Sequence, residues 1–123
     1  MLEYRRFSDT PVWQLAMDAA VSIFDLTESL PRKEDYALTS QIRRSANSIP
    51  ANIAEAFGRY HRGNKLNFYY NARGSLCETL SHLVYMHRVG YIDEKSKEQL
   101  DSKLNEVWVQ LNLIIKQLRD ARS

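Results

Sequence analysis

The chain has 123 residues, of which 44% are hydrophobic and 26% charged, and its formal net charge is +2 at pH 7. This composition is typical of a single soluble globular domain, spanning residues 1–123. No apolar run approaches the roughly 18 residues of a membrane span, and the N-terminus lacks the apolar stretch of a secretory signal, so we expect no membrane partner. The lone Cys77 excludes an intrachain disulfide, suits a cytoplasmic protein, and is interpreted as a small buried side chain.

Charge is distributed unevenly along the chain. Residues 1–35 hold 4 Lys/Arg and 7 Asp/Glu, residues 36–92 hold 7 and 2, and residues 93–123 hold 6 and 6. The basic middle segment is compatible with contact to a polyanion. A solvated face, or one that forms salt bridges between chains, would leave the same pattern, because charge distribution reports association and not a particular ligand.

The first predicted helix covers about residues 9–30. Ser8 or Asp9 can cap it, and Pro11 falls in its first turn, where a missing N–H group is tolerated. Pro31 is expected to end it. Its apolar stripe recurs at helical spacing, at Val12, Leu15, Ala19, Ile23, Leu26 and Leu30.

A second helix is predicted over about residues 36–58, and it contains Pro50. A proline there removes one backbone hydrogen bond and presses on the carbonyl of Ala46, at a cost of about 3 kcal/mol if unrelieved. The apolar stripe keeps its phase across the proline, which favours one continuous helix with a kink at Pro50. A true break, with Ser48 capping a new helix, is the alternative. Polar neighbours that can satisfy the freed groups are Ser45, Asn47, Ser48 and Asn52.

Two longer helices follow, over about residues 64–89 and 93–121. In the helix predicted over 64–89, the apolar stripe reaches His87 when it is extended by one turn. Gly90 is expected to end this helix. Asp93 is expected to cap the second. Its seam is Leu100, Leu104, Val107, Leu111, Ile114 and Leu118. Four helices with short connections predict an all-α fold, an antiparallel up-and-down four-helix bundle.

Several large apolar side chains lie off these stripes. A monomeric bundle would leave them in water, and a patch of that size favours a protein partner. Wider stripes that face the core would take up the same residues. We favour self-association, with a candidate interface at Trp13, Met17, Phe24, Phe68, Tyr70 and Trp108.

No motif for catalysis, a cofactor or a metal is found. The chain has no GxGxxG, P-loop, HExxH or CxxC. Glu78 and His82 are interpreted as an ordinary pair one helical turn apart, and Ser45, Ser48 and Ser75 as close-packing positions. We therefore expect neither an enzyme nor a bound cofactor or metal.

Three segments of the chain are distinctive: F-x-D-x-x-V-W (Phe7 to Trp13), LTSQIRRSANSIPANIAEAFGR (Leu38–Arg59) and GSLCETLSHL (Gly74–Leu83). Together they resemble the four-helix-bundle family of proteins encoded in 23S rRNA intervening sequences. The second is the most specific, and it departs from the family only in having Ser45 where Ala is usual and Ala56 where Gly is usual. The resemblance extends over about residues 7–119.

The resemblance implies a bundle that assembles as a ring, in known members a homopentamer, without enzymatic activity. More distantly, it extends to accessory proteins of diversity-generating retroelements, which bind a reverse transcriptase and nucleic acid through a basic surface. The first hypothesis is thus a ring-forming adaptor for RNA or DNA, in which Tyr60 and His61 could stack on bases. Its candidate contacts are Arg43, Arg44, Arg59, Tyr60, His61, Arg62, Lys65 and Arg73.

A second hypothesis assigns the arginines to the oligomer itself. In this alternative the protein is a structural or protein-interaction ring with no nucleic-acid role. Its arginines would form salt bridges to acidic residues of the neighbouring chain, for example Asp18, Asp25 and Glu28. A third hypothesis, a bundle that holds a small molecule or a metal, is disfavoured because the sequence offers no convergent polar groups.

Overall fold

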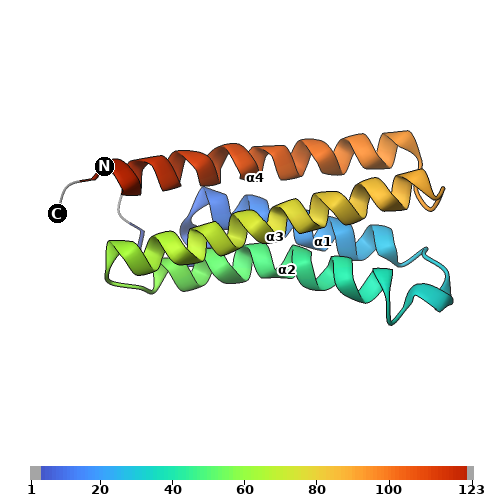
Figure 1. The fold of residues 1–123 in the computed structure, drawn as a ribbon, viewed down its shortest axis with the longest axis horizontal. Helices are drawn as coiled ribbons and strands as arrows, with labels where there is room; N and C mark the ends of the chain where they lie inside the picture. The colour runs from blue at the N-terminus through green and yellow to red at the C-terminus, as the bar shows by residue number, and fades with distance from the viewer. Residues whose placement is uncertain (1–3, 122–123) are drawn as a thin grey trace.

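A computed structural model describes residues 4–121 of the chain. Its four α-helices are α1 (Pro11–Thr27), α2 (Leu38–Phe57), α3 (Arg62–Arg88) and α4 (Glu94–Asp120), with two short 3₁₀ turns, η1 (Phe7–Asp9) and η2 (Arg32–Glu34). Successive helices run in opposite directions, and α1 also packs against α4 (Figure 1). The antiparallel up-and-down four-helix bundle is therefore confirmed. Within the described residues, no helix is long and apolar enough to cross a membrane.

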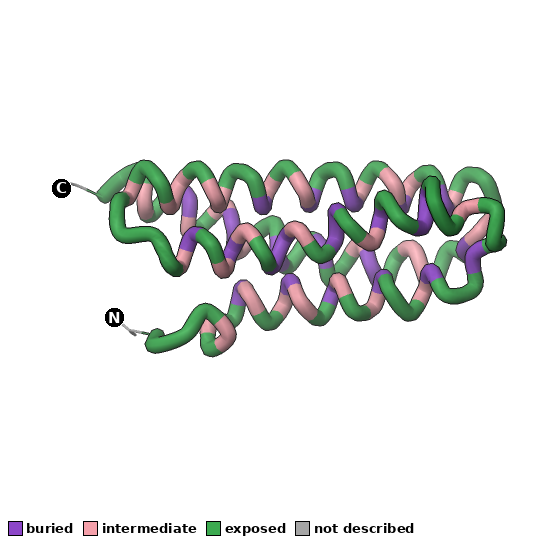
Figure 2. Tube along the Cα trace, turned by 90° about the horizontal axis from the view of Figure 1, so that it is seen from below, coloured by how far each residue is buried: buried purple, intermediate pink, exposed green. Residues whose placement is uncertain are grey.

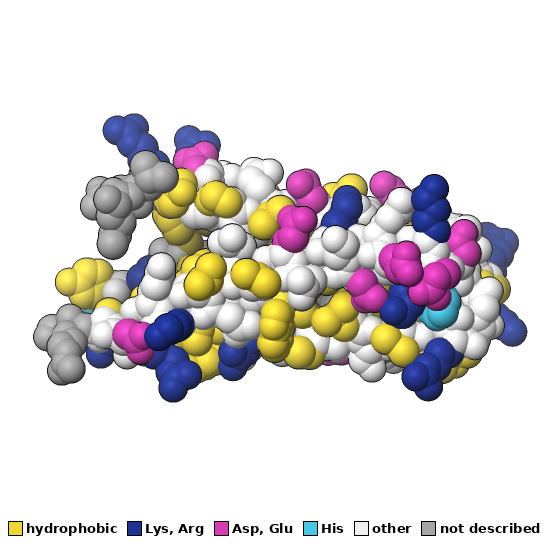
Figure 3. Space-filling model, turned by 90° about the horizontal axis from the view of Figure 1, so that it is seen from above, with side chains coloured by type: hydrophobic (Ala, Val, Ile, Leu, Met, Phe, Trp, Pro, Cys, Tyr) yellow, Lys and Arg dark blue, Asp and Glu magenta, His cyan; other side chains and the backbone are white. Residues whose placement is uncertain are grey.

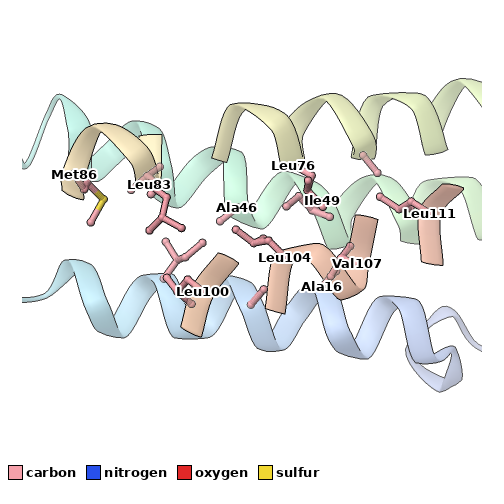
Figure 4. Packing of buried hydrophobic residues seen from close by; sticks show 14 of the residues in the cluster. Ala16, Ala46, Ile49, Leu76, Leu83, Met86, Leu100, Leu104, Val107 and Leu111 are labelled. Atoms are coloured by element: carbon pink, nitrogen blue, oxygen red, sulfur yellow. The ribbon is translucent and has the colours of Figure 1, made fainter. Parts of the chain in front are cut away.

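The hydrophobic core runs along the whole bundle. Buried residues recur on the inner side of each helix (Figure 2), and small Ala16 and Ala46 lie among the larger Ile49, Leu76 and Leu104 (Figure 4). This mixture of sizes lets the layers interdigitate at close packing. Each buried Leu or Ile side chain contributes roughly 1.5–3 kcal/mol of transfer free energy.

Helix α2 runs through Pro50 without a break. The structure thus supports the continuous helix over a new helix starting at Ser48, and the kink itself stays a prediction. Pro50 is buried, and the Asn52 side chain donates 2.8 Å and 2.9 Å hydrogen bonds to the carbonyl and the hydroxyl of Ser48. The carbonyl that Pro50 leaves without its helical donor is that of Ala46, so the expectation that polar neighbours satisfy the freed groups stays a prediction.

Helices α2 and α3 form the closest pair in the bundle, and hydroxyl groups join them. Ser45 Oγ lies 2.8 Å from Thr79 Oγ1, and Ser75 Oγ donates to Ser48 Oγ at 2.9 Å. Small side chains allow this approach, and the paired hydroxyls avoid the penalty of unsatisfied buried polar atoms. The serines are close-packing positions, as predicted.

Helix α1 ends earlier than predicted, at Thr27 instead of residue 30. The Thr27 hydroxyl donates back to the carbonyls of Ile23 and Phe24, so the last turn is satisfied before Pro31 is reached. Leu30 still packs into the core, although it lies beyond the helix. The other helices begin and end within two residues of their predicted bounds.

Two predicted stripes are slightly out of phase. Met86, and not His87, continues the buried stripe of α3, and His87 instead pairs with Glu94 at 2.8 Å across the α3–α4 turn. In α4 the buried residue near the end is Ile115, with Ile114 only half-buried. These shifts arise because each position adds 100° around a helix, so an extrapolated stripe can land one residue away from the core.

Candidate interaction surfaces

Arg43 ties α2 to the end of α1. Its Nε donates to Thr27 Oγ1 at 2.8 Å, and its Nη2 donates to the Phe24 carbonyl at 3.3 Å and lies 3.5 Å from Glu28 Oε2. The guanidinium also lies over the Phe24 ring, 4.0 Å from its centroid. A cation at a helix C-terminus is favourable because the last carbonyls carry partial negative charge. Arg43 therefore serves the fold, and its acidic partner belongs to its own chain.

Arg44, the next residue, is exposed and has no ion pair or hydrogen bond within residues 4–121. It lines a hollow of ≈470 Å³ between α1 and α2, which we call the α1/α2 groove. Phe24, 48% exposed, forms part of its apolar wall. The residues lining this groove are Met17, Ala20, Val21, Phe24, Arg43, Arg44 and Asn47.

The α2–α3 turn and the first turn of α3 together carry five of the predicted contacts. Tyr60 is 90% exposed and meets the ring of His61 edge-on at 5.1 Å. Arg59 pairs with Glu55 at 3.2 Å, and Arg62 donates to the carbonyl of Ala121. The Tyr60 ring is thus presented to solvent, and the two arginines beside the aromatic pair already contact groups of their own chain.

Lys65 has a different role from its neighbours in the turn. Its Nζ donates to the carbonyls of Ala56 and Phe57, at 3.1 Å and 3.3 Å, and so caps the end of α2. Partial burial lowers the pKa of this amine below its usual value, because burial disfavours the charged form. Its ammonium group is directed at backbone oxygens and is only partly available to a ligand.

Arg73 lies between α3 and α4. Its Nη1 donates to Asn112 Oδ1 at 2.8 Å, and its guanidinium lies 5.2 Å from the Tyr70 ring and 5.9 Å from the Trp108 ring. It is half-buried against these rings. Arg73 is thus partly buried, as its place on the apolar stripe suggested, but its polar partner is a neutral amide and it takes part in no ion pair within residues 4–121.

Arginine–ring contacts show that the predicted nucleic-acid contacts and the predicted oligomer interface are not separate surfaces. Arg43 covers Phe24, Arg59 lies 4.7 Å from the Phe68 ring, and Arg73 covers Tyr70 and Trp108. Each arginine comes from the predicted nucleic-acid contacts and each ring from the predicted interface. A partner at either surface would therefore meet both kinds of side chain.

A second hollow, of ≈500 Å³, lies between α3 and α4 and is called the α3/α4 groove. Cys77 is exposed in it, so our interpretation of this residue as a buried side chain is wrong. The prediction failed because Leu76, one residue earlier, takes the core position. The lining residues are Cys77, Leu80, Asp101, Ser102, Asn105 and Trp108.

The remaining predicted interface residues are partly covered by their own chain. Trp13 packs edge-on against Phe7 of η1, with 5.2 Å between ring centroids, and Met17 is half-buried beside the α1/α2 groove. Figure 3 looks onto the α4 side, where hydrophobic side chains gather along the middle of the face. Exposed apolar side chains therefore lie in the two grooves, at Val21, Phe24 and Trp108, and also outside them on α4, at Val109 and Leu113.

Charge separates along the bundle axis, a feature that the sequence analysis missed. The half with the α2–α3 turn comprises residues 4–16, 48–74 and 108–121; it holds 8 Lys/Arg and 3 Asp/Glu. The other half, residues 17–47 and 75–107, holds 8 and 11. We call these the basic half and the acidic half. The fold adds to the basic half four cations that were not predicted as contacts, Arg5, Arg6, Lys116 and Arg119.

The histidines and acids do not gather around a metal. Within residues 4–121, no group of three His, Cys, Asp or Glu side chains could hold a metal ion. Glu78 and His82 form the predicted pair one turn apart, with 3.4 Å between Oε2 and Nε2.

Comparison with known proteins gives a consistent fold and family. A crystal structure from Bacteroides thetaiotaomicron VPI-5482, described as a protein of unknown function from the S23 ribosomal protein family, is 30% identical. It superposes with a TM-score of 0.80 over 85% of this chain and 95% of that one. No curated protein matches. The family model described as 23S rRNA-intervening sequence protein matches residues 8–113. The chain therefore belongs to the 23S rRNA-intervening sequence protein family.

Proposed function

We propose that this protein is a non-enzymatic module that self-associates through its two grooves. The observation that carries the proposal is their placement. Because α1, α2, α3 and α4 follow one another around the bundle, the α1/α2 groove and the α3/α4 groove lie on opposite sides. Two different faces that bind each other form a head-to-tail contact, and such contacts close into rings when the rotation permits.

Chemistry at the two grooves supports this pairing. Both are largely apolar. The first carries the cation Arg44, which has no ion pair within the described residues 4–121, whereas the second carries the carboxylate of Asp101. Asp101 already accepts from Lys97 at 2.7 Å, so an arriving Arg44 would join an existing pair. Of the two predicted intersubunit arginines, Arg44 keeps this role in the proposal. Arg43 does not, because it pairs with Glu28 of its own chain.

Light scattering on two variants tests the self-association. Val21→Asp places a charge in the first groove and Cys77→Asp places one in the second, and both residues are exposed in the single chain. The wild type should have a mass several times the 14.4 kDa of one chain, five times for the homopentamer that the family resemblance implies. Each variant alone should be monomeric.

A mixture of the two variants sharpens the test. Each retains the groove that the other has lost, so head-to-tail pairing predicts a 1:1 heterodimer and nothing larger. A symmetric dimer through one groove would leave one variant dimeric and give no heterodimer in the mixture. Tyr36→Ser, at a residue 99% exposed and outside both grooves, is the matched control. A wild-type protein with the mass of one chain would contradict the proposal.

Binding of RNA or DNA at the basic half is the second candidate function. The observation that favours it is Tyr60, a 90% exposed ring flanked by Arg59 and Arg62, because bases stack on such rings while cations meet the phosphates. Fluorescence anisotropy with a single-stranded RNA should show binding at low salt that falls steeply as salt rises. Absence of binding at low salt would reject this candidate and leave self-association intact. A reverse-transcriptase partner stays a prediction of the family resemblance.

A further inference from the structure

The outer side of α4 carries apolar side chains that its own bundle does not cover. Val109 and Leu113 are 48% and 50% exposed, whereas Val107 and Leu111, two residues earlier in each case, are fully buried. Two residues turn a helix by about 200°, so Val109 and Leu113 point away from the core, one turn apart. We call this pair the α4 ridge. Single apolar side chains on a surface are normal, but a row of them beside an apolar groove that holds Trp108 favours a partner.

A shallow hollow of ≈540 Å³ lies on α2 beside η1, and we call it the η1/α2 hollow. It continues the α1/α2 groove along α2, because that groove reaches Asn47 and the hollow begins at Ala51, one turn later. Helices α2 and α4 lie on opposite corners of the bundle and do not contact each other within residues 4–121. The α4 ridge can therefore meet this hollow only in another copy of the chain. The lining residues are Phe7, Ala51, Ala54, Glu55, Gly58 and Arg59.

The ridge and the hollow lie at the same height along the bundle. The hydrogen bond between Ser75 and Ser48 marks one level, shared by α3 and α2. The hydrogen bond from Arg73 to Asn112, which lies within the α4 ridge, marks a second level, two residues earlier along α3 and about 3 Å away. Because α2 runs opposite to α3, the hollow, which begins three residues after Ser48, falls on that second level. A contact between α2 of one copy and α4 of the next then needs no shift along the axis, as a closed ring requires.

Charged pairs on the two helices follow each other in opposite order. On α2, Glu55 precedes Arg59 by one turn, and the two charges lie 3.2 Å apart. On α4, Lys116 precedes Asp120 by one turn, and these charges lie 2.8 Å apart. Helices α2 and α4 run in the same direction (Figure 1), so a parallel placement side by side sets the acid of each pair against the base of the other. An antiparallel placement would set acid against acid, which is costly.

The register fixed by these pairs also places the apolar side chains and one further cation. Counted back along both helices from the paired charges, Ala51 falls between the two members of the α4 ridge. Arg44 falls between Asp101 and Glu106. Arg44 has no ion pair within residues 4–121, and Glu106 is exposed, so both are available to a neighbouring copy. One register thus agrees with the charges, the apolar contact and the shared height.

We infer that α4 of one copy lies along α2 of the next, in parallel, with Val109 and Leu113 on either side of Ala51. The inference rests on the self-association proposed above and names the two helices at the centre of that contact. Each helix then enters a groove of the other copy, α4 the α1/α2 groove and α2 the α3/α4 groove. The other way for the grooves to interdigitate, with α1 against α3, would leave the α4 ridge in water.

Disulfide cross-linking tests the contact. In a Cys77→Ser background, Ala51→Cys with Leu113→Cys should give covalent multimers on oxidation, because the two Cα atoms come within the roughly 7 Å that a disulfide spans. The matched control is Ala51→Cys with Ser102→Cys, on the same side of α4 but three turns away, which should stay free of cross-links. A cross-link from Val21→Cys to the native Cys77 would instead place α1 against α3 and overturn the inference.

Light scattering under reducing conditions separates two kinds of failure. A wild-type protein with the mass of one chain would overturn the self-association, and this inference with it. An assembly that forms, but that gives no cross-link between positions 51 and 113, would leave the self-association intact and overturn only the packing of α4 against α2.

An exchange of charges gives a second test that needs no cysteine. Glu55→Lys and Lys116→Glu should each weaken assembly about tenfold, measured as dissociation on dilution, because each sets like charges across the contact. The double variant restores opposite charges and should assemble within about threefold of wild type. Single variants that assemble like wild type, or a double variant no better than either single one, would overturn the inference.

Discussion

The basic half and the acidic half carry the same number of cations. Each holds 8 Lys/Arg, but the basic half holds 3 Asp/Glu and the acidic half 11. The molecule is therefore polarised by where its acids lie and not by where its arginines lie. Figure 3 shows this directly, with Asp and Glu gathered away from the end that holds the α2–α3 turn. A polyanion would meet net positive charge at one end only.

The fold explains why counting charge along the chain misplaces this polarity. Antiparallel helices bring the start of one helix beside the end of the next, so each segment contributes to both halves. Arg43 and Arg44 belong to the basic middle segment, yet they lie in the acidic half, where Arg43 pairs with Glu28. Lys116 and Arg119 belong to a segment of zero net charge, yet they lie in the basic half.

The largest effect is expected on nucleic-acid affinity. In the double variant Arg59→Gln with Arg62→Gln, affinity for a single-stranded RNA should fall well over tenfold at about 50 mM salt, because two phosphate contacts are lost. The slope of log affinity against log salt should shrink by about 1.4, at roughly 0.7 for each contact. Anisotropy titrations over a series of salt concentrations measure both quantities.

The matched pair of changes in the other half is Arg32→Gln with Lys33→Gln. These exposed cations lie among acids, and their loss should change RNA affinity by less than about twofold, because net negative surroundings disfavour phosphate there. Equal losses from the two double variants would show that the polarity of the bundle does not direct binding.

Each half also uses one cation to cap the end of a helix, and the cap in the acidic half should contribute more. Arg43→Met should lower the free energy of unfolding by about 1–2 kcal/mol, since it removes hydrogen bonds to Thr27 and the Phe24 carbonyl. Arg44→Met, at the exposed neighbour, should stay within about 0.5 kcal/mol of wild type. Urea unfolding measures both, and similar losses would show that Arg43 does not act as a cap.

In the basic half, Lys65→Met should lower the free energy of unfolding by about 1 kcal/mol. The methionine keeps the apolar stem in place but loses the two hydrogen bonds to the last carbonyls of α2. Burial lowers the pKa of this amine, so part of its interaction energy is already offset by desolvation. For this reason the loss should be smaller than for Arg43→Met in the same urea experiment.

Most of the fold could be predicted from the sequence, because helical periodicity is local. The stripe containing Ile42, Ile49 and Ile53 showed that α2 continues past Pro50. The early end of α1 could not be predicted in this way, because it depends on the Thr27 hydroxyl and on Arg43, 16 residues away. Contacts between helices decide such details, and periodicity does not report them.

The candidate surfaces were less predictable than the fold. Sequence identified the arginines and the off-stripe rings as residue types, but not that Arg43 covers Phe24 or that Arg73 lies between Tyr70 and Trp108. Nor could it place Arg5 or Lys116 in the same half as Arg59. Which charges lie together depends on how the helices pair, and a single sequence gives no measure of that pairing.

The smallest expected effect compares one carboxylate from each half at acid pH. The Ser96 backbone N–H, 2.8 Å from Asp93, lowers the pKa of Asp93 at the start of α4, and a hydrogen bond from Lys116 lowers the pKa of Asp120 at its end. Both lowered pKa values add stability above the unfolded value of about 4, and this stability is lost as pH falls through the folded pKa. In Asp93→Asn and in Asp120→Asn, the free energy of unfolding should therefore fall less steeply than in wild type as the pH is lowered.

Salt should separate these two carboxylates. The Asp120–Lys116 pair is exposed, so the stability that it contributes, and that is lost at acid pH, should disappear at about 1 M salt. At that salt concentration charges interact over only about 3 Å. Asp93 accepts a 2.8 Å hydrogen bond from the Ser96 N–H at the helix start, which salt screens less, so the stability that Asp93 contributes should persist at high salt. Thermal unfolding between about pH 2 and 5 at both salt levels, with each Asn variant beside wild type, measures the difference. If high salt removed the stability contributions of Asp93 and Asp120 equally, Asp93 would act as a surface charge and not as a cap.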